Sequence, residues 1–114
     1  MIVALLNWLR KFWVELRRRS AYANVRTIDS MDSLPIRLGR TIYIVSRGGE
    51  PRWVVFDCPC GCGARIDVNL MKSKCPSWDL FEEEGAVTLR PSLWQPAGTC
   101  MSHFFIERNR VRWV

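Results

Sequence analysis

Three cysteines fall within five positions of this 114-residue chain, at Cys58, Cys60 and Cys62, with a proline and a glycine between them. Such a run cannot continue a β-strand, so residues 58–63 are predicted to form a tight turn in which glycine allows a positive φ. Cysteines this close in sequence make poor disulfide partners for one another, because the bridge requires a particular Cα separation and orientation. The clustered thiols therefore indicate a metal site in a reducing compartment.

A second group of candidate ligands lies roughly 40 residues further on, where Cys100 and the only histidine, His103, are three positions apart. Zinc prefers four thiolate or imidazole ligands in a tetrahedron. One expected ligand set is Cys100, His103 and two of the three clustered cysteines. The alternative is all four of these cysteines, with His103 free. The fifth cysteine, Cys75, precedes a proline in a polar loop and is expected to be a free thiol.

Zinc is the expected cofactor, and the site is expected to be structural. An iron–sulfur cluster is less favoured, because a Rieske centre needs two histidines and the chain has one. The H-E-x-x-H pattern of zinc peptidases and the H-x-E pattern of zinc deaminases are both absent from the sequence. In a core this small, the free energy of metal binding would contribute to folding.

From residue 41 onward, apolar and polar residues alternate with the period of a β-strand. The fold is predicted to be mainly β, a small zinc-stabilised antiparallel sandwich or partly open barrel with an N-terminal amphipathic α-helix. The expected division is a basic amphipathic helix at 1–19, a weakly structured linker at 20–40 and a zinc-binding β domain at 41–114. The predicted strands are 41–46, 52–57, 64–70, 78–81, 86–90, 104–107 and 110–113.

The N-terminal residues 2–19 repeat apolar side chains at spacings of three and four, which predicts an amphipathic helix. Five Lys or Arg against one Glu give residues 1–19 a charge of +4, which leaves +2 of the total +6 for the body. The helix is expected to pack on the body or on a second copy, or alternatively to contact a partner helix or an anionic membrane surface. The nearly neutral body disfavours a nucleic-acid-binding zinc ribbon.

The uncharged stretch before Arg10 has nine residues, too few to span a bilayer, and no signal-peptide cleavage site follows it. Together with the reduced cysteines, this predicts a cytoplasmic protein, with peripheral membrane contact through residues 1–19 as the alternative.

Two serines are candidate nucleophiles. Ser102 directly precedes His103, and Ser92 lies just past a predicted strand end. A serine nucleophile needs a general base within hydrogen-bond distance, and His103 is the only imidazole. Adjacent residues of a strand point to opposite faces, so Ser92 makes the better pair with His103. That pair requires a metal held by cysteines alone, because a histidine bound to zinc is a poor base.

These motifs resemble a family of small bacterial domains that carry a Cys-Pro-Cys-Gly-Cys-Gly run, a T-L-x-P-S segment and a closing C-x-S-H-F hairpin. The chain has CPCGCG at 58–63, TLRPS at 88–92 and CMSHFFI at 100–106, and the resemblance covers about residues 25–114. Members of that family accompany bacterial ubiquitin-like conjugation systems, often in anti-phage defence islands. The resemblance implies a zinc-binding protein whose partners are the ubiquitin-like modifier and its E1- and E2-type enzymes.

Such systems also need a peptidase that matures or removes the modifier. A role as that serine-type peptidase is therefore inferred from the pathway that the resemblance implies, with Ser92, Ser102 and His103 as the available catalytic groups. The alternative is a non-catalytic zinc-binding adaptor that docks the modifier or its conjugation enzymes.

Overall fold

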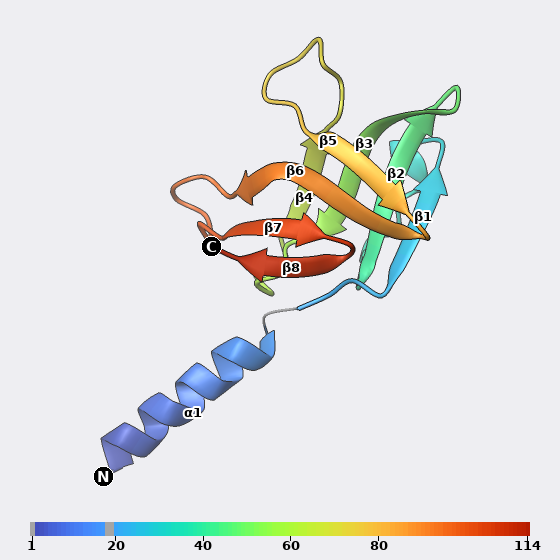
Figure 1. Cartoon of the computed structure of the whole chain (residues 1–114). Coiled ribbons are helices and arrows are strands. Elements are labelled where there is room, and N and C mark those ends of the chain that lie inside the picture. Colours follow the sequence, from blue (N-terminus) through green and yellow to red (C-terminus); the bar gives the residue numbers. More distant parts are fainter. Residues whose placement is uncertain (1, 18–19) are drawn as a thin grey trace.

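The computed structural model describes residues 2–17 and 20–114, without the side chains of residues 11 and 13–17. In these residues the chain forms one N-terminal helix, α1 (Ile2–Arg17), then eight strands and a short 3₁₀ helix, η1 (Met31–Ser33) (Figure 1). The strands are β1 (Asn24–Ile28), β2 (Thr41–Arg47), β3 (Glu50–Asp57), β4 (Arg65–Asn69), β5 (Asp79–Glu83), β6 (Ala86–Trp94), β7 (His103–Glu107) and β8 (Arg110–Trp113).

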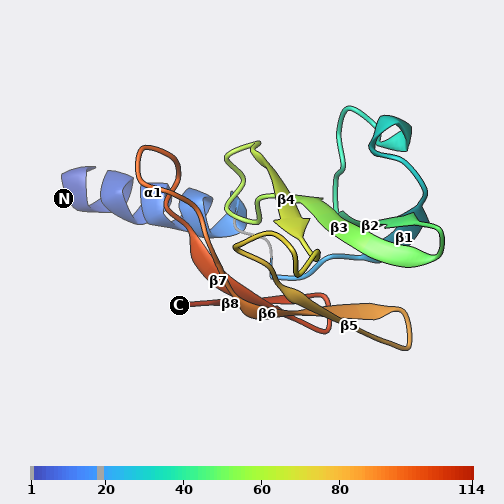
Figure 2. The ribbon, with the colours of Figure 1, turned by 90° about the horizontal axis from the view of Figure 1, so that it is seen from above.

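Two four-stranded sheets pack face to face as a sandwich (Figure 2). The strand order is β1-β2-β3-β4 in the first sheet and β5-β6-β7-β8 in the second. Neighbouring strands are antiparallel except β1 and β2, which run parallel. Within the described ranges, strand pairing does not close the two sheets into a barrel. The mainly β prediction is confirmed, and the sandwich is the architecture the chain adopts.

Apolar side chains from both sheets fill the space between them. Phe56 of β3 and Phe104 of β7 are fully buried, with ring centroids 6.3 Å apart in an edge-on arrangement. Because successive residues of a strand point to opposite faces, burial of Phe104 leaves His103 and Phe105 on the outer face of the second sheet. The outer face of β7 is therefore where a polar site can form without disturbing the core.

Each of the seven predicted strands has a counterpart in the structure, but two differences stand out. Strand β6 continues past Pro91 to Trp94, four residues beyond the predicted end at Arg90. Strand β1 was not predicted and lies within residues 20–40. Its sequence, NVRTI, buries little apolar surface, and it forms by pairing with β2 along the register that begins at Asn24 and Thr41. Pairing with a neighbour, rather than alternation, explains this strand.

Helix α1 extends away from the sandwich (Figure 1). The predicted helix is present over Ile2–Arg17, and residues 18–19 of the prediction lie outside the described residues. The large apolar residues between Ile2 and Trp8 are 57% to 76% exposed. The expectation that this face packs on the body of the same chain is therefore wrong for these side chains. The described helices include none with the length and apolar character needed to cross a bilayer.

Candidate functional site

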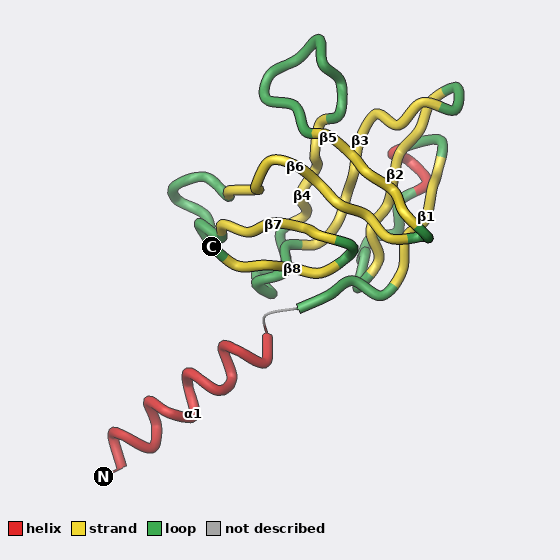
Figure 3. Tube along the Cα trace, viewed as in Figure 1, coloured by secondary structure: helices red, strands yellow, loops and turns green. Residues whose placement is uncertain are grey.

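Two loops bring four cysteine side chains together. Cys58, Cys60 and Cys62 lie in the turn between β3 and β4, and Cys100 lies in the loop between β6 and β7 (Figure 3). The turn is closed by the Cys58 amide, which donates to the carbonyl of Ala64 at 2.8 Å. Gly61 and Gly63 have φ values of 88° and 85°, as expected from a run in which glycine supplies the left-handed backbone.

The four sulfur atoms have the spacing of a metal site. All four Sγ atoms lie within 4.8 Å of one another, and Cys58 Sγ is 3.4 Å from Cys60 Sγ and 3.7 Å from Cys100 Sγ. These distances are too long for a disulfide, where sulfurs are about 2.05 Å apart. In a tetrahedral zinc site with Zn–S bonds of about 2.3 Å, neighbouring sulfurs are about 3.8 Å apart. The cluster therefore fits a tetrahedral ion, and Cys75 is exposed and does not belong to it.

The cysteines of the cluster differ in their protonation tendency. Burial raises the pKa of the Cys58 thiol above its ordinary value. At Cys100 partial burial acts in the same direction, but hydrogen bonds from Ser102, then from Cys60 and Cys58, outweigh it and lower the pKa to about 6. The thiolate is the form that binds a metal ion. One member of the cluster is thus already stabilised in its ligating form by its neighbours.

A serine and the histidine form a second polar pair on the outer face of the second sheet. His103 Nε2 lies 2.8 Å from Ser92 Oγ, within hydrogen-bond distance. Ser92 lies near the end of β6 and His103 begins β7, and the register pairs Trp94 with His103 and Leu93 with Phe104. Leu93 and Phe104 are buried, so the residues beside them on each strand face outward.

A break in the β6–β7 ladder accompanies this pair. The register shifts between Leu89 and Leu93, so the three residues between them, Ser92 included, do not follow regular pairing. Such irregularities re-aim side chains within an otherwise regular sheet. The Ser92 carbonyl accepts a hydrogen bond from Trp78 Nε1 at 3.2 Å, which fixes the backbone of this stretch.

The His103 ring is also held by an aromatic neighbour. Trp94 stacks on it, with ring centroids 4.5 Å apart and an interplanar angle of 5°. The His103 carbonyl accepts a hydrogen bond from the amide of Val114, which ties the start of β7 to the C-terminus. The predicted strand 86–90 ends before Trp94, whereas β6 extends to it and so brings Trp94 opposite His103. In the sequence, the one indication of this contact is that Trp94 follows Ser92 by two residues, the spacing that puts two side chains on the same face of a strand.

Ser102 belongs with the cysteines rather than with the histidine. Its hydrogen bonds reach Cys100, and its carbonyl accepts from the amide of Gln95 at 2.9 Å. His103, in turn, lies outside the four-sulfur cluster and directs Nε2 at Ser92. The predicted site residues thus separate into two groups, four cysteines with Ser102 nearby and Ser92 with His103.

A pocket of about 520 Å³ lies on the outer face of the second sheet. Its wall includes Pro91, which precedes Ser92, and Phe105, which is two residues past His103 on the same face of β7. Arg90 also lines it, with its guanidinium 5.7 Å from the centre of the Phe81 ring. Ser92 and His103 themselves do not line this pocket, and Pro91 is the wall residue next to Ser92 in the sequence.

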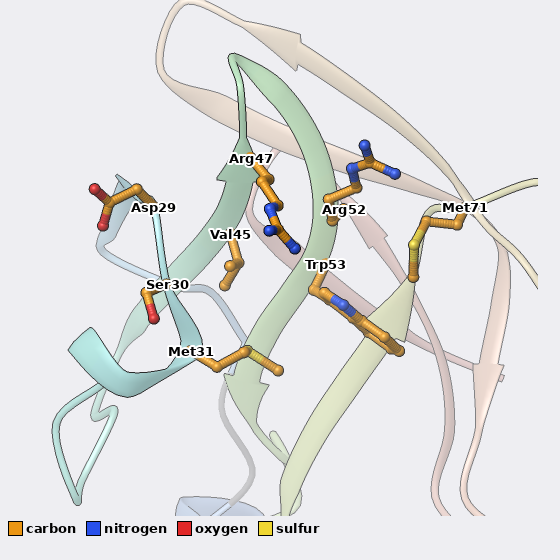
Figure 4. Close-up of a pocket in the computed structure, with 8 residues that line it drawn as sticks. All are labelled: Asp29, Ser30, Met31, Val45, Arg47, Arg52, Trp53 and Met71. Atoms are coloured by element: carbon orange, nitrogen blue, oxygen red, sulfur yellow. The ribbon is translucent and has the colours of Figure 1, made fainter.

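Another pocket, of about 620 Å³, lies on the outer face of the first sheet (Figure 4). Figure 4 shows Val45 and Arg47 of β2 and Trp53 of β3 projecting toward it. None of the residues that line it belongs to the cysteine cluster or to the Ser92–His103 pair. This pocket is therefore not assigned a part in the candidate site, although its volume is larger than that of the pocket beside Pro91.

A serine hydrogen-bonded to a histidine is the nucleophile–base pair of serine hydrolases, and here it lies on a β-sandwich that also carries a cysteine cluster with the spacing of a metal site. The model of the family described as "Bacterial ubiquitination-like system serine protease (BubE)" matches residues 28–114, and the chain belongs to this family. Comparisons with curated proteins and with solved structures found no match. The resemblance inferred from the CPCGCG, TLRPS and CMSHFFI segments is confirmed, and the family ties this domain to bacterial ubiquitination-like systems.

Proposed function

We propose that this protein is a serine peptidase that processes or removes the ubiquitin-like modifier of a bacterial conjugation system. The observation that supports this most directly is the 2.8 Å contact between Ser92 Oγ and His103 Nε2. A nucleophile within hydrogen-bond distance of its general base is the minimal requirement of serine catalysis. The family description names a serine protease of a bacterial ubiquitination-like system, which supports the modifier of such a system as the substrate.

In this proposal Ser92 is the nucleophile and His103 the general base. With a proton on Nδ1, Nε2 accepts the Ser92 hydroxyl proton while Oγ attacks the carbonyl carbon of the scissile amide. His103 then gives this proton to the leaving amine as the C–N bond breaks, and an acyl-serine remains. A water molecule attacks the acyl-serine and loses its proton to His103, and the proton returns to Ser92 Oγ as the carboxylic acid leaves.

The cysteine cluster is proposed to hold one zinc ion through Cys58, Cys60, Cys62 and Cys100. The sulfur spacing supports this set, because it matches a tetrahedron of thiolates. Bound there, zinc would supply a cross-link between the β3–β4 turn and the β6–β7 loop. With four cysteines as ligands, His103 keeps its Nε2 for Ser92.

The substrate is proposed to lie across the outer face of the second sheet. The pocket is lined by Arg90, Pro91 and Phe105, and Pro91 directly precedes Ser92 in β6. An extended C-terminal tail of a modifier that lies in this pocket would therefore run close to Ser92. A strand-like segment covers about 3.3 Å per residue, so a few residues of such a tail would span this face.

The experiment is cleavage of the modifier fused through its C-terminus to a reporter protein, together with labelling by a fluorophosphonate, which reacts with activated serines. Ser92→Ala is expected to lower cleavage by about 10³-fold or more and to abolish labelling. Ser102→Ala is the matched control, because it removes the other serine beside the histidine and should retain cleavage within a few-fold.

A wild-type protein that binds the modifier but neither cleaves the fusion nor reacts with the probe would contradict the proposal. That result would favour the adaptor alternative. Equal losses in Ser92→Ala and Ser102→Ala, both with a lower melting temperature, would show that the serines act only in the fold.

A further inference from the structure

The imidazole of His103 lacks the partner that usually orients a catalytic histidine. In Ser–His–Asp triads a buried carboxylate accepts a hydrogen bond from Nδ1, fixes the tautomer and stabilises the imidazolium. Among the residues whose side chains are described, no carboxylate forms an ion pair or hydrogen bond with His103. The polar contact of its ring is Ser92 Oγ.

Trp94 occupies the position from which this ring can be held. The indole lies parallel to the imidazole, 4.5 Å away, and the two residues are directly paired across β6 and β7. Trp94 also follows Ser92 by two residues on the same strand, so one strand presents the nucleophile and the surface that supports the base. Tilting the imidazole out of this plane would break the face-to-face contact.

The exposure of Trp94 argues against a role in the core. Its side chain is 65% exposed, whereas Leu93 next to it is buried. A large exposed indole on a strand does little for folding, because the hydrophobic gain comes from area removed from water. The contact with His103 therefore gives this tryptophan a role that packing does not.

We propose that Trp94 is a positioning residue, which holds the His103 ring in line with Ser92 and stabilises the positive charge on the imidazole during catalysis. This inference rests on the proposed function. The π-face of an indole attracts a cation, and the imidazole becomes a cation when it takes the serine proton. Trp94 would thus supply, by stacking, orientation and charge stabilisation of the kind that a carboxylate supplies in a triad.

The variants that test this are Trp94→Ala, which removes the stack, and Trp94→Phe, which preserves an aromatic face. Trp94→Ala is expected to lower kcat by about 10- to 100-fold and to slow fluorophosphonate labelling to a similar degree, because a misdirected base loses proximity. KM should stay within about threefold, since binding is not the affected step. Trp94→Phe should recover most of kcat. Trp8→Ala is the matched control, because Trp8 is also an exposed tryptophan and its ring stacks on Phe12 of the N-terminal helix.

A readout independent of activity is the NMR spectrum of the imidazole. The chain has one histidine, so its ring protons give a single assignable set of signals. A stacked indole shifts these protons upfield, and Trp94→Ala should move them downfield while Trp8→Ala leaves them in place. Wild-type signals without an upfield shift would overturn the inference.

The remaining outcomes separate this inference from the peptidase proposal. If Trp94→Ala moves the imidazole signals but leaves kcat and labelling unchanged in an active protein, the positioning role alone is wrong. A large rise in KM at constant kcat would overturn it too, because Trp94 would then bind substrate rather than support the base. A wild-type protein with a stacked imidazole that neither cleaves nor is labelled would contradict both proposals.

Discussion

The cysteine cluster and the Ser92–His103 pair are joined by one loop, but they are built from different kinds of structure. The cluster takes its side chains from two loops, one from each sheet, and Cys58 within it is buried. The pair takes its side chains from two neighbouring strands of one sheet, and both residues are partly open to solvent. A group that links two sheets suits support of the fold, whereas a half-exposed pair on paired strands suits chemistry with a substrate.

The chain's one imidazole decides how the two regions share their residues. In the structure it faces Ser92 across 2.8 Å, and the sulfur atoms cluster without it. If the histidine joined the metal, the serine would lose its base. The comparison therefore yields tests in which one region is damaged and the other is measured.

The largest expected effect comes from His103→Gln. This change removes the general base, so cleavage should fall by about 10³-fold or more. Metal content per protein, measured by elemental analysis, should stay at the wild-type value, and the melting temperature should change by only a few degrees. Loss of half or more of the metal would show that His103 is a ligand and would break the separation between the two regions.

A smaller effect on activity and a larger one on stability are expected at the cluster. Cys62→Ser, or prolonged treatment with a chelator, removes part of the cross-link between the sheets, and the energy of metal binding is lost from folding. A loss of a few kcal/mol lowers the melting temperature of a domain this size by roughly 10 °C or more. Calorimetry measures this, with Cys75→Ser as the control that should match the wild type. An unchanged melting temperature in Cys62→Ser and after chelation would contradict the structural role.

The smallest effect is expected in the pocket. Arg90→Ala removes a guanidinium that lines the pocket beside Pro91. If the substrate crosses this face, KM for the modifier fusion should rise by about threefold to tenfold while kcat stays within twofold. Arg65→Ala, at an arginine paired with Asp67 on the first sheet, is the control and should change neither constant. Equal kinetics for both variants would place the substrate elsewhere.

Much of the fold follows from the sequence because it depends on local patterns. Alternation predicts the strands that supply the core, and the proline and glycines of residues 58–63 predict the turn that gathers three thiols. β1 could not be predicted in this way, because NVRTI has little alternation and is held by pairing with β2. The predicted end of β6 at Arg90 is wrong because it, too, was inferred from local sequence alone. A proline usually ends a strand, but Pro91 lies within β6, at the irregular stretch of the β6–β7 ladder.

The sequence predicts which residues can form the candidate site, but it does not decide between the two possible ligand sets. The spacing of the cysteines and His103 gives five possible ligands, and no spacing rule says which way the imidazole points. That direction depends on the β6–β7 register, which places His103 opposite Trp94 and on the outward face. The same register explains why the Trp94 stack is invisible in the sequence, since it joins residues on two strands.

The account depends most on a metal held by sulfur alone, which leaves the imidazole to the serine. X-ray absorption at the metal edge of the purified protein measures the first coordination shell directly. It should show four sulfur neighbours at about 2.3 Å and no nitrogen, as a tetrahedral zinc–thiolate site requires. A shell of three sulfurs and one imidazole nitrogen would contradict the account, because His103 would then be bound to the metal and unable to act as the base of Ser92.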